Sequence, residues 1–315
     1  MESEHPLTFA DQVRAIPGGE HLEMCFSCGT CVSKCMIQQK VEPEYNPRRL
    51  LRMVMMDMRE EAFKSPTTWL CSACDLCYPA CPQEIHISGV IGAVKQLAVE
   101  AGYTSPLETV SVDEALCSGC GICVMTCPYE APHLIEKEVN GVMDRFSEVD
   151  NDKCMGCGMC VAACPMGAIA RPGVTNTEIV SQIKIKKQKN IPSLIVFICD
   201  WSLRADDDLE ILERYPENVR VIHIPCSGRI DPQMALIALR SGIDGVLVCG
   251  CAPGECHYQR GTYVSACKLS LLDRMLGQID LADGRVRFVQ LGTQDRGRIR
   301  HEVDTMLAGL QREVA

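Results

Sequence analysis

Cysteine is the residue type in this chain whose number and spacing can do chemistry. Sixteen of the 22 cysteines fall into four copies of one spacing, C-x2-C-x2-C-x3-C. The four quartets are Cys25, Cys28, Cys31, Cys35; Cys71, Cys74, Cys77, Cys81; Cys117, Cys120, Cys123, Cys127; and Cys154, Cys157, Cys160, Cys164. Three thiolates from one tight loop and a fourth three residues later suit a 4Fe–4S cubane. The repeated spacing predicts four 4Fe–4S clusters and electron transfer as the principal function.

The ligands of each cluster follow from the crossed arrangement of two-cluster ferredoxins. There the last cysteine of a quartet reaches the partner cluster. The expected ligand sets are Cys25, Cys28, Cys31 with Cys81; Cys71, Cys74, Cys77 with Cys35; Cys117, Cys120, Cys123 with Cys164; and Cys154, Cys157, Cys160 with Cys127.

The residues around the quartets favour clusters over zinc and over disulfides. Three quartets end in Cys-Pro, and Gly29, Gly121 and Gly158 lie inside loops where the backbone must approach sulfide closely. Structural zinc usually takes two C-x2-C pairs separated by a longer loop. No basic region followed by an apolar one is visible at Met1–Pro17. We therefore expect a cytoplasmic chain whose thiols stay reduced and free for metals.

Length, charge and missing motifs exclude several function classes. A chain of 315 residues can form two or three domains. The net charge of −10 argues against nucleic acid as a partner, and no apolar run approaches the ~20 residues of a transmembrane segment. No G-x-G-x-x-G follows a strand, so we expect no FAD or NAD site of its own. No catalytic residue stands out, which favours an electron-carrying component of an oxidoreductase complex.

The fold is expected to be multidomain, and its first two domains carry two quartets each. Residues 1–103 read as an α-helical 4Fe–4S domain. Asn46-Pro47 is a helix start, followed by Leu50, Leu51, Val54, Met55 and Met58 at helical spacing. A second helix carries Ile87, Val90, Ile91, Val94 and Leu97 and stops at Gly102. Residues 104–175 read as an α+β bacterial-type ferredoxin domain with a hairpin turning at Asn140-Gly141.

The third domain, residues 176–315, changes character. Continuous apolar runs at Ser193–Ile198, Val219–Ile224, Gly245–Val248 and Val286–Leu291 alternate with helical stretches at Asp231–Arg240, Tyr263–Leu276 and Asp295–Leu310. Strands that alternate with helices predict an α/β domain with a parallel, doubly wound sheet of the flavodoxin or Rossmann kind.

Six cysteines lie outside the quartets, all of them in the third domain. Cys199, Cys226, Cys251 and Cys256 lie at or just beyond the carboxyl ends of the predicted strands, the edge where such sheets build their sites. Four thiols meeting there would suit a 2Fe–2S cluster, and buried free thiols are the alternative.

Four further candidates lie near these strands, and the interpretation of two of them stays open. Cys249 and Cys267 are interpreted as packing residues. His257 could replace a thiolate or simply form hydrogen bonds. Arg229 could place positive charge beside a cluster, anchor a partner, or form a surface ion pair.

These motifs resemble known families over nearly the whole chain. Residues 7–103 resemble the C subunit of heterodisulfide reductase in Cys25-x2-Cys28-Gly29-Thr30-Cys31, Tyr45-Asn46-Pro47-Arg48, Trp69-Leu70-Cys71 and Cys81-Pro82-Gln83. Residues 108–172 look like a ferredoxin with two 4Fe–4S clusters. Residues 192–313 resemble the delta subunit of methyl-viologen-reducing hydrogenase in Ile224-Pro225-Cys226-Ser227-Gly228-Arg229 and in Gly250-Cys251-x-Pro253-Gly254-Glu255-Cys256-His257-Tyr258.

The resemblance implies that the chain is one subunit of a larger enzyme complex. The delta subunit passes electrons between a dehydrogenase or hydrogenase and a flavin-containing A subunit, and the C subunit passes them on towards a catalytic B subunit. A fusion of both would be one electron-carrying subunit of an anaerobic complex of the flavin-based electron-bifurcating kind. One departure is that the family usually has Cys-x-Trp-Cys after its first strand, where this chain has Cys199-Asp200-Trp201-Ser202. Either Ser202 alters the 2Fe–2S cluster, or Cys199 alone serves.

The same residues are compatible with two other functions. In one, the α/β domain is itself a reductase with Cys226 or Cys251 as a redox thiol of low pKa. In the other, the chain is a redox-sensing cluster protein. Four cubanes are more than sensing needs, so we rank that reading last.

Overall fold

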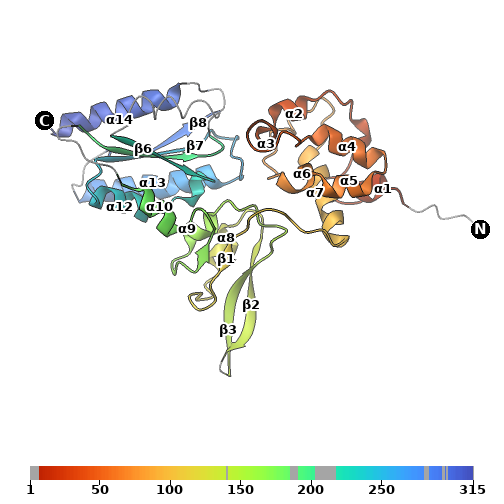
Figure 1. The fold of residues 1–315 in the computed structure, drawn as a ribbon, viewed down its shortest axis with the longest axis horizontal. Helices are drawn as coiled ribbons and strands as arrows, with labels where there is room; N and C mark the ends of the chain where they lie inside the picture. The colour runs from red at the N-terminus through yellow and green to blue at the C-terminus, as the bar shows by residue number, and fades with distance from the viewer. Residues whose placement is uncertain are drawn as a thin grey trace, which may run out of the picture. The chain divides into compact units, whose positions relative to one another are not determined.

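The structure is a computed structural model and describes residues 7–139, 141–184, 191–202, 218–279, 284–292, 295 and 297–314. The chain divides into two compact units, Met1–Leu107 and Glu108–Ala315. Figure 1 colours the first unit from red to yellow-orange and the second from yellow to blue. The boundary predicted near residue 175 therefore falls inside the second unit.

The first unit is helical in its described residues. Its helices are α1 (Phe9–Arg14), η1 (Leu22–Met24), α2 (Thr30–Lys34), α3 (Met36–Lys40), α4 (Pro47–Met55), α5 (Arg59–Lys64), α6 (Pro66–Leu70) and α7 (Ile87–Glu100). The Asn46 side chain accepts the Arg49 N–H at 3.0 Å, which satisfies a free donor at the start of α4. Gly102, with φ +87°, follows the end of α7. Both predicted helices are confirmed, although α4 ends at Met55 and leaves Met58 outside it.

The hydrophobic core of the first unit is continuous with its cysteine loops. Helices α1, α4 and α7 bury Phe9, Leu51 and Val90 against one another. Cys31 belongs to this core, and Cys71 packs against it. The apolar faces of the helices therefore hold the cysteine loops in place.

The second unit begins with two short helices and two antiparallel strand pairs. These elements are β1 (Ser111–Val112), α8 (Ile122–Thr126), β2 (Pro132–Val139), β3 (Val142–Val149), α9 (Met159–Ala163) and β4 (Ile169–Ala170). Strand β1 pairs with β4, and β2 pairs with β3 from Pro132 opposite Val149 to Val139 opposite Val142. The predicted hairpin is therefore present, with Gly141 at φ +82° in its turn; Asn140 lies outside the described residues.

The rest of the second unit contains a four-stranded parallel sheet. Its elements are α10 (Asn176–Gln182), β5 (Leu194–Cys199), β6 (Val219–Ile224), η2 (Ser227–Arg229), α12 (Pro232–Arg240), β7 (Gly245–Cys251), α13 (Gly261–Gln278), β8 (Val286–Leu291) and α14 (Arg298–Val314). The strand order is β6-β5-β7-β8, with all neighbours parallel. All four predicted strands are confirmed, and β7 runs on to Cys251, beyond the predicted end at Val248.

Helices cover both faces of this sheet. Helix α14 packs Ile299 and Val303 onto one face, and α10, α12 and α13 cover the other, as Figure 1 shows. Because both faces are covered, the central strands β5 and β7 are buried throughout. The edge strands β6 and β8 carry exposed residues such as Arg220 and Arg287. Among the helices of the described part of the chain, none is long and apolar enough to cross a membrane.

Candidate iron–sulfur sites

Four cysteines of the first unit surround one pocket and form the first thiol group. They are Cys25, Cys28, Cys31 and Cys81. Gly29, at φ +85°, turns the loop into the start of α2, and Arg48 reaches over the loop to donate to the Ser27 carbonyl at 3.3 Å. Burial raises the pKa of Cys31 to about 11, with Cys25 next among the causes. The first quartet thus meets the last cysteine of the second.

The second thiol group joins the rest of the second quartet to Cys35. Its members are Cys71, Cys74, Cys77 and Cys35. Burial raises the pKa of Cys71 to about 11, and Cys74 and Cys35 raise it further. The hydroxyl of the buried Tyr45 interacts with both Cys35 and Cys71. A hydroxyl aimed at two sulfurs is the kind of donor that tunes a cluster through hydrogen bonds.

The third thiol group lines a pocket in the second unit. Its members are Cys117, Cys120, Cys123 and Cys164. Backbone N–H groups donate to two of the sulfurs, from Ser147 to Cys117 at 3.4 Å and from Ala168 to Cys164 at 3.3 Å. Such donors are of the kind that tunes a cluster through hydrogen bonds to sulfur.

The fourth thiol group is the most buried of the four. Its members are Cys154, Cys157, Cys160 and Cys127. Burial raises the pKa of Cys157 and of Cys160 to about 12, so both thiols hold their protons at neutral pH until a metal displaces them. Cys160 also lies near Cys123 of the third group.

All four groups therefore combine three cysteines of one quartet with the last cysteine of its neighbour. This is the grouping that the crossed-ligand rule predicts. Four thiols fit a cubane in every group, supported by glycines in the loops of the first, third and fourth quartets and by backbone donors to sulfur in the first and third groups. Among the described residues, no three Cys, His, Asp or Glu side chains converge tightly enough to hold a single metal ion.

The C-terminal thiols, Cys199, Cys226, Cys251 and Cys256, meet at the carboxyl edge of the parallel sheet. Cys199 ends β5, Cys251 ends β7, and their sulfurs are 3.8 Å apart. Cys226 interacts with Cys199, and Cys256 with Cys251. A Cβ atom at Gly261 would overlap the Cys226 sulfur and lie 3.7 Å from that of Cys256. The structure thus brings all four predicted thiols together.

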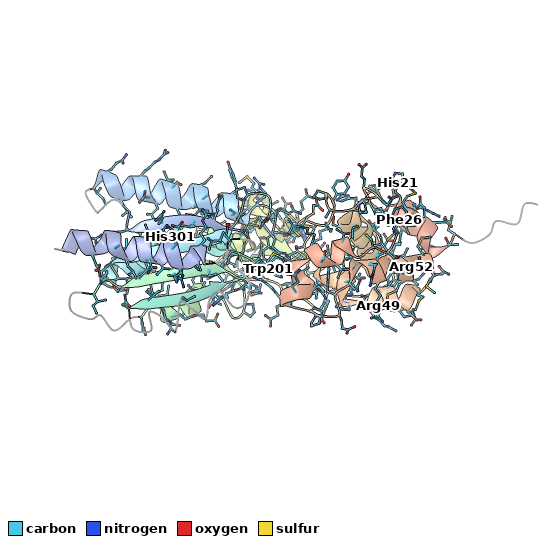
Figure 2. The ribbon with its side chains drawn as sticks, turned by 90° about the horizontal axis from the view of Figure 1, so that it is seen from above. His21, Phe26, Arg49, Arg52, Trp201 and His301 are labelled. Atoms are coloured by element: carbon cyan, nitrogen blue, oxygen red, sulfur yellow. The ribbon has the colours of Figure 1, made fainter. Side chains whose placement is uncertain are left out.

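Ser202 and His257 have other partners near these thiols. The Ser202 hydroxyl is fully buried and donates to the Cys199 carbonyl at 2.8 Å, so it braces the turn after β5. The His257 ring stacks on Trp201, with ring centroids 3.4 Å apart. Trp201 is labelled in Figure 2. The stack gives both rings a packing role beside Cys256.

The two cysteines interpreted as packing residues differ. Cys249 is buried in β7 and belongs to the core beneath α14, as expected. Cys267 is exposed on α13, so the packing interpretation is wrong for it. Helical spacing alone could not separate a core position from the adjacent exposed one.

The structure adds residues that the cysteine spacing did not identify. Tyr129, from the loop after the third quartet, lies near Cys157, Tyr258 and Cys226. Tyr258 lies near Cys226 and Cys157. Burial raises the pKa of both phenols. These two tyrosines lie where the fourth thiol group approaches the C-terminal thiols, and only the contact between distant segments reveals them.

The comparisons with known proteins agree with this division of sites. Residues 194–312 match the family described as methyl-viologen-reducing hydrogenase, delta subunit. Over 98 residues the chain is 36% identical to the D iron-sulfur subunit of F420-non-reducing hydrogenase from Archaeoglobus profundus, a match that covers 30% of this chain and 72% of that protein. The chain belongs to the delta-subunit family. The membership rests on the part of the chain that carries the C-terminal thiols.

Outside the delta-subunit region, residues 21–85 and 110–170 each match a 4Fe-4S dicluster domain. The chain is 32% identical over 98 residues to the C subunit of H(2):CoB-CoM heterodisulfide,ferredoxin reductase from Methanothermobacter marburgensis, covering 31% of this chain and 51% of that protein. It is 32% identical over 140 residues to the A subunit of ferredoxin/F(420)H(2)-dependent CoB-CoM heterodisulfide reductase from Methanosarcina acetivorans, covering 43% of this chain and 18% of that protein. The expected resemblances are confirmed, and the chain spans about half of the one relative and under a fifth of the other.

Proposed function

We propose that this delta-subunit family member is an iron–sulfur electron-transfer subunit of a heterodisulfide reductase-like complex. The observation that carries the proposal is the assembly of four thiol groups, each with three cysteines of one quartet and the last of its neighbour. Each group would hold one 4Fe–4S cluster, and the C-terminal thiols would hold a 2Fe–2S cluster. When bound, these clusters supply one-electron oxidation and reduction.

The chain's own residues set the environment of each cluster. Loop glycines let the backbone approach, N–H groups and the Tyr45 hydroxyl point at sulfur, and the core excludes water. Burial and hydrogen bonds to sulfur are the means by which proteins tune cluster potentials.

The proximity of the groups supports a path for electrons within each unit. Cys77 of the second group lies near Cys31 of the first. In the second unit, Cys160 lies near Cys123, and Cys226 lies near Cys157. We infer a path in the second unit from the third group through the fourth to the C-terminal thiols.

The finer features follow from the same proposal. The domains would be residues 1–103, resembling the heterodisulfide reductase C subunit, 104–175, a bacterial-type ferredoxin, and 176–315, a flavodoxin- or Rossmann-like domain of the delta-subunit kind. The partners would be a flavin-containing protein like the heterodisulfide reductase A subunit, a catalytic protein like its B subunit or of another kind, and a dehydrogenase or hydrogenase. They would form a cytoplasmic complex that bifurcates electrons at a flavin outside this chain.

A reductive titration tests the electron-carrying function. The anaerobically reconstituted chain should take up about five electrons, one for each of four cubanes and one for the 2Fe–2S cluster. Uptake of two electrons by a disulfide formed among the C-terminal thiols, with turnover abolished by Cys251→Ser while the four cubanes stay intact, would contradict it and favour a thiol-dependent reductase.

A further inference from the structure

Arg229 is a fully buried cation between the fourth thiol group and the C-terminal thiols. It ends η2, three residues after Cys226, and its side chain is 0% exposed. Helix α9, which follows Cys157, contacts η2. An arginine is almost never fully buried unless a partner satisfies it, so its surroundings decide what it does. The alternative of a surface ion pair is wrong for this residue.

The guanidinium is held by the segment that leads into α10. Its Nε donates to the Val174 carbonyl at 3.1 Å, and its Nη2 donates to the same carbonyl at 2.7 Å and to Asn176 Oδ1 at 2.8 Å. Its Nη1 is buried and has no hydrogen-bond partner among the described residues. The three bonds fix the orientation of the group, and none of the salt bridges among the described residues pairs it with a carboxylate.

The aliphatic stem of Arg229 runs across the loop of the fourth quartet. A Cβ atom at Gly158, which separates Cys157 from Met159, would lie 2.6 Å from Arg229 Cδ. A Cβ at Gly228 would lie 2.7 Å from Met159 Cγ. Glycine at both positions therefore lets the loop after β6 lie directly on the cluster loop.

The charged groups around the guanidinium leave it positive. Burial lowers the pKa of Arg229 to about 10, Asp231 and Cys160 act in the opposite direction, and Arg171 adds to the lowering. Lys268, half-buried on α13, lies near Asp231, Arg229 and Cys226. Its Nζ likewise has no hydrogen-bond partner among the described residues. Among these described side chains, the basic groups Arg229, Arg171 and Lys268 outnumber the one carboxyl group, that of Asp231.

We propose that Arg229 sets the reduction potential of the cluster held by the fourth thiol group, and thereby its exchange of electrons with the C-terminal thiols' cluster. The inference rests on the proposed ligation of both clusters. Four thiolates leave a cubane negatively charged, and reduction adds one more negative charge. A fixed cation in a low-dielectric site favours that added charge. One electron leaves one cluster and enters the other, with no proton or bond change.

The test is a redox titration of the full reconstituted chain, followed by EPR. Arg229→Met should lower the midpoint potential of one cubane and leave the other three unchanged. Arg229→Lys should restore most of the shift because it keeps the charge. Arg240→Met, at the exposed end of α12, removes the same charge elsewhere and should shift none.

A second variant decides the matter if Arg229→Met fails to fold. Asn176→Asp places a carboxylate beside the guanidinium and leaves Arg229 itself unchanged. This variant should lower the potential of the same cubane by less than Arg229→Met does. The proposal is overturned if the variants that fold have unchanged cluster potentials and lower melting temperatures. Arg229 would then serve only to stabilise the packing of η2 on α9. Absence of the fourth cubane from the unmodified chain would instead contradict the proposed function.

Discussion

Single residues decide which sulfur belongs to which cluster. Cys35 lies three residues beyond its quartet loop, yet it bonds to Tyr45 and lies near Cys74 rather than lining the pocket of the first group. The spacing of the cysteines predicted this exchange. The partner tyrosine was not predicted, because its place at Cys35 and Cys71 depends on how α3 and α6 fold together. The spacing of cysteines in the sequence predicts which of them bind iron. The group that donates a hydrogen bond to a given cysteine sulfur is found only from the folded structure.

Cys35→Ser tests the crossed ligation directly. A serine oxygen is a poorer iron ligand than a thiolate, so the variant should lose or alter the same EPR signal as Cys71→Ser. Cys25→Ser should affect a different one. Cys267→Ser, at an exposed position on α13, should leave every signal and the iron content unchanged. A spectrum of Cys35→Ser that matches Cys25→Ser would show that the quartets bind their clusters without crossing.

Secondary-structure elements bring the C-terminal thiols to one edge. The β-branched runs predicted the strands because a sheet covered on both faces needs continuous apolar segments. Parallel strands then placed Cys199, Cys226 and Cys251 at the same carboxyl edge. The close approach of α13 was not predictable from periodicity. Its first residue, Gly261, has space for a hydrogen only, because the Cys226 sulfur occupies the position of a side chain.

Gly261→Ala should therefore remove the C-terminal cluster alone. The added methyl group would displace the Cys226 sulfur, so the 2Fe–2S signal should disappear while four cubanes remain. Gly309→Ala on α14 is the matched control, because nothing lies within 4 Å of its Cβ. That change should stabilise the helix by about 0.5–1 kcal/mol in thermal unfolding. An intact 2Fe–2S signal in Gly261→Ala would refute the placement of the cluster at Cys226.

At the scale of the whole molecule, the thiol groups differ in their exposure to solvent. Cys28 and Cys120 are exposed members of the first and third groups, whereas Cys154, Cys157 and Cys160 are buried in the fourth. The sequence predicted the number of quartets and the α/β domain. It could not predict that the fourth quartet adjoins the C-terminal thiols, because that contact depends on the packing of α9 on η2. Within the second unit, an exposed thiol in the third group and buried thiols in the fourth fit a subunit that exchanges electrons at its surface.

Iron content with Mössbauer spectroscopy of the reconstituted chain tests the central claim most directly. The account predicts about eighteen iron atoms per chain, about sixteen with the spectrum of cubanes and about two with that of a 2Fe–2S cluster. About eight iron atoms per chain would mean that two of the four thiol groups and the C-terminal thiols hold no cluster, and would contradict the account.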